Sequence, residues 1–297
     1  MKTPISPEVR QQVLDLRRSY SLSAVAERTG LALGTVKTIC SRSGSFRDSP
    51  ALRLLFALPP IQPSSGTALA VPELPPQQEV TGDDELDAVL WLREVIKTGQ
   101  PVLIEKAMTA AKLIKTPLNA LEDRYTKHLV STNPGNWTVA FKTIGFANLE
   151  GLAQKSIEKL ALQHEAVSRF GDALFNDTPA EQFCIDTLDG TKPGRLFGLD
   201  DGEVDARFKA RPEMTPNTLS DCLHELGYWH DLYSLRNACD GGDQGQEAYA
   251  RECFVFRCLA HIRPRTKDEA IAVFRYLANR DCMDRPETKS ILLNLIG

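Results

Sequence analysis

Six prolines lie close together between Ala57 and Gly82 and divide the chain of 297 residues into a short first part and a longer second part. They occupy positions 59, 60, 63, 72, 75 and 76, in a stretch with almost no apolar periodicity. Proline favours an extended backbone of about 3.1 Å per residue. We therefore expect a proline-rich linker at residues 59–82 that lets the first part move relative to the second.

The two parts carry opposite charge. Residues 1–56 hold nine basic and four acidic side chains, a formal charge of +5, whereas the whole chain has a formal charge of -4. The remaining residues therefore carry -9. Because a positive field attracts phosphate and a negative one repels it, we expect any nucleic acid to bind the first part.

Residues 22–41, LSAVAERTGLALGTVKTICS, have the spacing of two helices joined by a tight turn. Ala26 is small enough for the helices to approach closely, and Gly30 can adopt the left-handed conformation of the turn. Four apolar residues would then face one another across the unit: Leu22, Val25, Val36 and Ile39. We expect helices at residues 7–19, 23–29 and 34–43, the last of which stops at Gly44.

This pattern resembles the helix-turn-helix of repressors, resolvases and transposases, and the resemblance covers residues 7–45. It implies a DNA-binding domain at residues 1–58 whose third helix enters the major groove of double-stranded DNA. Helical geometry turns five polar side chains of that helix outward, where they could bond base edges or phosphates: Thr35, Lys37, Thr38, Ser41 and Arg42. Three arginines would flank them and contact phosphate: Arg17, Arg18 and Arg47. The alternatives are a basic three-helix bundle without this role and a helix-turn-helix that binds protein.

The second part has helical rather than strand patterns. Apolar stripes at three- and four-residue spacing run from Asp83 to Gly99, Pro101 and Pro117 can each open a helix, and a longer helix runs from Asn148 toward Phe170. We expect a mainly α protein, in which a small N-terminal helix-turn-helix domain is joined to a larger all-α domain with helical subdomains at residues 83–170 and 216–297.

Glycine, proline and aspartate recur in residues 171–215, which predicts a long loop between the two subdomains. We interpret the acidic group at positions 200, 201 and 203 as a solvated turn. After the loop, Thr215-Pro216 predicts the start of a helix, and Thr266 with Glu269 predicts a capping box. Pro286 would open a last helix capped by Asp284, and the aromatic group of Tyr228, Trp229 and Tyr233 is typical of a core or a subunit interface.

Seven cysteines are scattered along the chain without a CxxC pair, which favours reduced thiols and a cytoplasmic location. We see no secretory signal and no apolar run near the roughly 18 residues of a membrane span. Four residues could in principle bind zinc, but their spacing favours buried thiols and amphipathic histidines: Cys222, His224, His230 and Cys239. Phosphate-loop, dinucleotide and nucleophile-elbow motifs are absent, so we expect no catalytic residue, metal or cofactor.

These observations predict a DNA-binding regulator or DNA-handling accessory factor of a bacterium, phage or mobile element. A single small domain reads little sequence, so we expect the helical body to form a homo-oligomer or to bind another protein. The alternative is an enzyme or toxin-like effector with its active site in the C-terminal body and the helix-turn-helix as a targeting or autoregulatory module.

Overall fold

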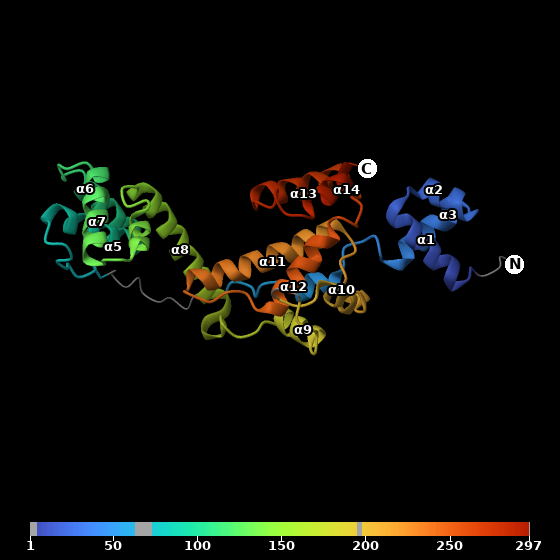
Figure 1. Cartoon of the computed structure of the whole chain (residues 1–297). Helices are drawn as coiled ribbons and strands as arrows, with labels where there is room; N and C mark the ends of the chain where they lie inside the picture. The colour runs from blue at the N-terminus through green and yellow to red at the C-terminus, as the bar shows by residue number, and fades with distance from the viewer. Residues whose placement is uncertain (1–4, 63–72, 195–197, 297) are drawn as a thin grey trace. The chain divides into compact units, whose positions relative to one another are not determined.

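The computed structural model describes residues 5–62, 73–194 and 198–296, and within them the protein is mainly α-helical, as predicted (Figure 1). In these ranges, extended backbone pairs only at an isolated antiparallel bridge between Pro193 and Leu199. The chain forms two compact units. Unit 1 comprises Met1–Pro59, Phe175–Ser234 and Gly242–Gly297, and unit 2 comprises Pro60–Leu174 and Leu235–Gly241.

Unit 2 is built on helices whose ends follow the sequence signals. Asp83 caps the first of them by accepting a bond from the backbone N–H of Leu86, and Pro101 opens the second. The elements are α5 (Asp84–Lys97), α6 (Pro101–Ala111), α7 (Leu118–Thr132), the 3-10 helix η1 (Trp137–Thr143), α8 (Leu149–Phe170) and the short η2 (Gly171–Ala173). Apolar side chains from α5, α6 and α8 share one core, and Leu121 and Phe146 extend it past α7.

Part of the expected linker is bound to unit 2. The indole Nε1 of Trp91 donates to the carbonyl of Pro75 at 2.8 Å, and the Asp87 carboxylate accepts backbone bonds from Val80, Thr81 and Gly82. Residues 63–72 of the linker lie outside the described residues. Residues 73–82 are therefore an N-terminal extension of α5 rather than a free tether.

In the described part of unit 1 there are three N-terminal helices and seven others. The first three are α1 (Pro7–Ser19), α2 (Leu22–Thr29) and α3 (Leu33–Ser43). The others are α4 (Pro50–Leu55), α9 (Pro179–Leu188), α10 (Asp201–Lys209), α11 (Leu219–Ala238), α12 (Gln246–Cys258), α13 (Lys267–Asn279) and α14 (Thr288–Ile296), with a short 3-10 helix η3 (Pro212–Met214). The last residues of α11, from Leu235 on, are assigned to unit 2.

The prediction of a long loop at residues 171–215 is wrong, because α9 and α10 lie within it. Thr178 and Glu181 form a complete capping box at the start of α9, and the side chain of Asp200 accepts a bond from the backbone N–H of Glu203 at the start of α10. The acidic group is thus the first turn of a helix, where carboxylates favour the helix dipole. Four of the glycines and prolines that predicted a loop lie between the two helices: Gly190, Pro193, Gly194 and Gly198.

Residues 48–58, which we expected in the N-terminal domain, contact helices from the set α9 to α14, which we call the C-terminal helices. The backbone N–H of Ser49 donates to both oxygens of the Asp221 carboxylate at 3.1 Å. Phe56 is fully buried, with its ring centroid 5.7 Å from those of Tyr228 and Trp229. Trp229 is likewise fully buried, so this aromatic group belongs to the core of unit 1.

Two predicted helix starts are displaced. The helix expected at Thr215-Pro216 begins at Leu219, because the hydroxyl of Thr218 accepts the backbone bond from Asp221. The helix expected at Pro286 begins at Thr288, so Asp284 lies too far away to cap it.

The Thr266 capping box forms only in part. The Thr266 hydroxyl accepts from the backbone N–H of Glu269, but the Glu269 carboxylate accepts from the backbone N–H groups of Ser220 and Arg265 instead of returning to Thr266.

An ion pair is buried completely in unit 1. The guanidinium of Arg251 bonds both carboxylate oxygens of Glu225, at 2.6 and 2.8 Å, and both side chains have no exposed surface. Four phenylalanine rings have centroids 4.7–5.7 Å from the guanidinium carbon: Phe56, Phe183, Phe208 and Phe254. Burial alone lowers the pKa of Arg251, but the Glu225 carboxylate outweighs it and the pKa lies above its usual value. Arg251 is therefore a permanent cation inside an aromatic cage.

We expect Glu225→Leu or Arg251→Met alone to lower the free energy of unfolding by about 3–5 kcal/mol, because each leaves a buried charge without its partner. The double variant should lose clearly less free energy of unfolding than the sum of the two single losses. Urea unfolding measures these free energies. The control is Glu94→Gln, which breaks an exposed pair with Lys97 and should cost less than about 1 kcal/mol. Additive losses in the double variant would contradict the coupling.

Gly99 ends α5 where the chain passes close to α8. Its φ is +71°, and a Cβ built there would lie 2.5 Å from the backbone oxygen of Ser156. We expect Gly99→Ala to lower the free energy of unfolding by more than about 2 kcal/mol, since it adds a backbone clash to left-handed strain. Gly135→Ala, at φ +85° with open space around it, is the matched control and should cost about 1 kcal/mol. Equal losses in thermal unfolding would rule out the clash.

Candidate nucleic-acid interface

The first three helices have clear local causes. The hydroxyls of Ser6 and Ser21 cap α1 and α2 by accepting bonds from the backbone N–H groups of Val9 and Ala24. Gly30 ends α2 at φ +67°, and Gly44 ends α3 at φ +75°. Both glycines take the left-handed conformation that other residues rarely adopt. The expected helices are therefore present, and α2 and α3 each begin one residue earlier than predicted.

These three helices, which we call the head, share a core of their own, which we call the head core. Val13, Val25 and Val36 are fully buried in it, and Cys40 is 8% exposed. Partly buried residues from all three helices surround them, including the predicted Leu22, Ala26 and Ile39. The apolar spacing of residues 22–41 thus identified the contacts between α2 and α3 correctly.

The outward face of α3 carries most of the predicted site residues. Lys37, Thr38, Ser41 and Arg42 are exposed on one side of the helix, and Thr35 is half-buried. The hydroxyl of Thr38 donates to the carbonyl of Gly34 at 2.8 Å, so its lone pairs remain as acceptors. This face therefore offers two cations and several hydroxyls to a ligand.

Two predicted arginines are partly engaged within the head. Arg47 donates to the hydroxyl of Ser41 at 3.0 Å, which holds its guanidinium at the C-terminal end of α3. Arg17 donates to the carbonyl of Tyr20 at 3.0 Å and lies over the ring of Phe46. Arg17 therefore stabilises the junction of α1 and α2 in addition to any contact with phosphate. Arg18 lies in α1, and its side chain is outside the described residues.

The sequence reasoning missed Arg28 as a site residue. Its guanidinium carbon lies 3.9 Å from the centroid of the Tyr20 ring, at the C-terminal end of α2. A stacked guanidinium still presents its N–H groups at its edge, so Arg28 adds an ordered cation to the head. The signal available in the sequence was an arginine in the last turn of the second expected helix, with a tyrosine eight residues before it.

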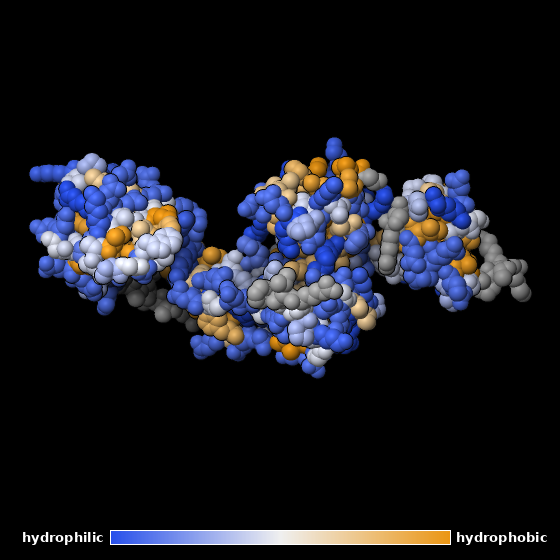
Figure 2. Space-filling model, in the orientation of Figure 1, coloured by the Kyte–Doolittle hydropathy of each residue, from blue (hydrophilic) through white to orange (hydrophobic). Residues whose placement is uncertain are grey.

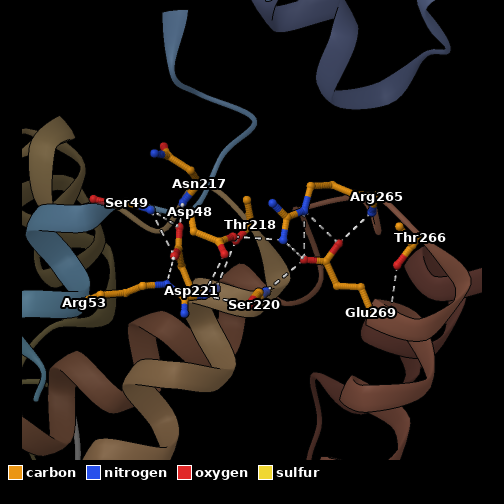
Figure 3. A network of polar contacts seen from close by, with 10 residues as sticks. All are labelled: Asp48, Ser49, Arg53, Asn217, Thr218, Ser220, Asp221, Arg265, Thr266 and Glu269. Atoms are coloured by element: carbon orange, nitrogen blue, oxygen red, sulfur yellow. Dashed lines mark hydrogen bonds and ion pairs between the residues drawn. The ribbon is translucent and has the colours of Figure 1, made fainter. Parts of the chain in front are cut away.

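Arg53, the last of the nine basic residues in positions 1–56, is not part of the outward face of α3. Arg53 pairs with Asp48 and Asp221, in a network that continues through Arg265 to Glu269 (Figure 3). Asp221 is fully buried, and its carboxylate accepts bonds from the backbone N–H groups of Ser49 and Asn217. We call this set the Asp221 network. The charges of Asp48 and Arg53 cancel, so removing residues 48–56 from the count leaves residues 1–47 with a formal charge of +5.

The residues considered for zinc do not converge. Cys222 is buried, the ring of His224 faces the carbonyl of Arg53, and His230 contacts Arg280. Within the described ranges, no group of three or more histidine, cysteine or acidic residues is placed to hold a metal ion.

Four thiols in the C-terminal helices are poor nucleophiles. Burial raises the pKa of Cys258 to about 12, and it also raises the pKa values of Cys184, Cys222 and Cys253. These thiols are protonated at neutral pH, whereas the thiolate is the nucleophile.

Comparison with protein-family models, curated proteins and solved structures finds no match to this chain. Among the residues that the structure describes, no helix has both the length and the apolar character needed to cross a membrane.

Proposed function

We propose that the protein binds double-stranded DNA through the outward face of α3. The observation that carries the proposal is the position of Lys37, Thr38, Ser41 and Arg42 together on the exposed side of a helix whose other side is fixed in the head core. A helix held in this way can enter the major groove, where threonine and arginine contact base edges and phosphates. The head charge of +5 supplies attraction that is independent of sequence.

The biological role that fits this proposal is a transcriptional regulator or a DNA-handling accessory factor of a bacterium, phage or mobile element. We further propose a cytoplasmic location. Its support is that all seven cysteines are free in the structure, as a reducing compartment would keep them.

We also propose that two copies pair through α13 and α14. Figure 2 shows apolar side chains gathered over these helices. Leu293 is 59% exposed, Ile296 is 83% exposed, and Phe274 and Ile271 on α13 are 50% and 36% exposed. These four side chains expose on the order of 400 Å² of apolar surface. Two such faces with their polar rims would bury roughly 1,000 Å², the lower limit for a specific interface.

The charges around α13 and α14 favour a second copy as the occupant of this face. Exposed residues of both signs lie on these helices or between them: Lys267, Asp268, Arg275, Asp281 and Lys289. A surface with both signs can pair with itself in a symmetric dimer, because cations of one copy can meet carboxylates of the other. Such a dimer would present two heads to two half-sites.

For DNA binding, we expect the affinity of the full-length protein to fall steeply with salt. Lys37→Ala and Arg42→Ala should each weaken binding to any duplex and reduce the slope of log affinity against log salt by about 1. Thr35→Ala with Thr38→Ala should reduce sequence preference. Lys112→Ala, an exposed lysine of unit 2, is the control and should change nothing. Fluorescence anisotropy measures all of these, and affinity that is independent of salt would refute the proposal.

For the dimer, we expect Phe274→Ser with Leu293→Ser to raise the dissociation constant at least about tenfold, because the apolar centre of the interface is lost. Sedimentation equilibrium without DNA measures this and does not depend on DNA binding. Leu113→Ser is the matched control, since this leucine of unit 2 is 80% exposed. A monomer at micromolar concentration, or a dimer that survives the double change, would contradict this interface.

A further inference from the structure

Unit 2 exposes large apolar side chains where α7 ends and η1 follows. Trp137 is 70% exposed, Phe141 57%, Ile144 74% and Val130 46%. The rings of Trp137 and Phe141 meet edge to face, with centroids 5.4 Å apart and an interplanar angle of 74°. We call these four residues the Trp137 surface. Exposed apolar groups of this size mark interaction sites when they lie together.

The backbone beneath the Trp137 surface is held by polar contacts. The hydroxyls of Thr126 on α7 and Thr143 on η1 lie 2.8 Å apart, and the side chain of Asn136 caps η1 by accepting from the backbone N–H of Thr138. Ile144 directly follows η1, and its backbone N–H donates to the carbonyl of Phe141 at 3.2 Å. The surface is therefore preorganised, which lowers the entropic cost of binding.

The segment that carries the Trp137 surface has charged side chains of one sign. No aspartate or glutamate occurs between Arg124 and Leu149, although the whole chain is acidic. Arg124 is paired with Asp83 at 3.0 Å, whereas Lys127 and Lys142 are exposed on α7 and η1. Lys127 precedes Val130 by three residues, so these two side chains are neighbours on α7, and Lys142 lies next to Phe141 along η1.

This chemistry selects among possible occupants. Two copies that met symmetrically here would bring lysines against lysines, which is unfavourable. Single-stranded nucleic acid stacks its bases on aromatic faces, but the edge of one ring against the face of the other leaves no two parallel planes for successive bases. An apolar protein segment with flanking carboxylates satisfies both features, because its apolar side chains cover the rings and its carboxylates meet the lysines.

We propose that the Trp137 surface docks a protein segment that presents apolar side chains flanked by aspartate or glutamate. Trp137 is the anchor, since tryptophan contributes most at the centre of such interfaces. Lys127 and Lys142 form the rim, which speeds association and rejects basic partners. This inference does not depend on DNA binding by the head.

The test is selection of a phage-displayed library of random short peptides on the immobilised full-length protein. We expect enriched peptides to combine apolar residues with aspartate or glutamate. Their affinity should fall at least about tenfold for Trp137→Ser with Phe141→Ser. It should fall several-fold for Lys127→Glu with Lys142→Glu, and more so at low salt. Val102→Ser on α6 with Leu113→Ser, two residues after the end of α6, is the matched control in the same unit and should leave affinity unchanged.

The proposal is overturned if selection enriches no peptide, if enriched peptides lack acidic residues, or if they bind the Trp137→Ser Phe141→Ser variant as well as the original. Tighter binding of an oligothymidylate probe than of any selected peptide, lost in that same variant, would assign the surface to nucleic acid instead. Circular dichroism of each variant shows whether unit 2 is still folded. The substituted residues Trp137, Phe141, Lys127 and Lys142 are all exposed, so a folded variant with unchanged peptide binding counts against the proposal.

Discussion

The burial of one arginine determines how the C-terminal helices of unit 1 pack. A guanidinium without water is tolerated only when its charge and most of its donors are satisfied, so the elements around Arg251 must each supply a partner. Glu225 on α11 supplies the charge, and the carbonyl of Met214 accepts a further bond at 2.7 Å. Phe56, directly after α4, and phenylalanines from α9, α10 and α12 supply the faces of the cage. No one of these segments can leave without exposing the ion pair.

The same constraint explains why the chain after the head belongs to this core. Phe56 closes one side of the cage, and the Asp221 network holds the residues just before it. Phe46 packs in the head core and Asp48 bonds Arg265, so only Arg47 lies between the two sets of contacts. The proline-rich segment therefore follows α4 and leads into unit 2, and it is not the connection between the head and the C-terminal helices.

Elements defined by local chemistry were predictable, and elements defined by distant partners were not. Apolar spacing and two left-handed glycines sufficed to predict α1, α2 and α3, because these signals lie within the helices or directly at their ends. The same signals at Thr178 and Asp200 were present but were outweighed by the glycines and prolines near them. The packing of residues 48–58 depends on bonds such as that from Ser49 to Asp221, which lies 172 residues further along the chain. No local sequence pattern reveals such a partner.

The candidate site shows the same division. Which residues of α3 face outward follows from helical period alone, and the structure exposes four of the five. The roles of the flanking arginines do not follow, because each depends on a neighbour from another segment: Arg17 on Phe46, Arg28 on Tyr20 and Arg47 on Ser41. Ordered in this way, these cations would lose less entropy on binding an anion than free side chains would. The head thus holds three cations in defined positions, which supports the proposed contact with phosphate.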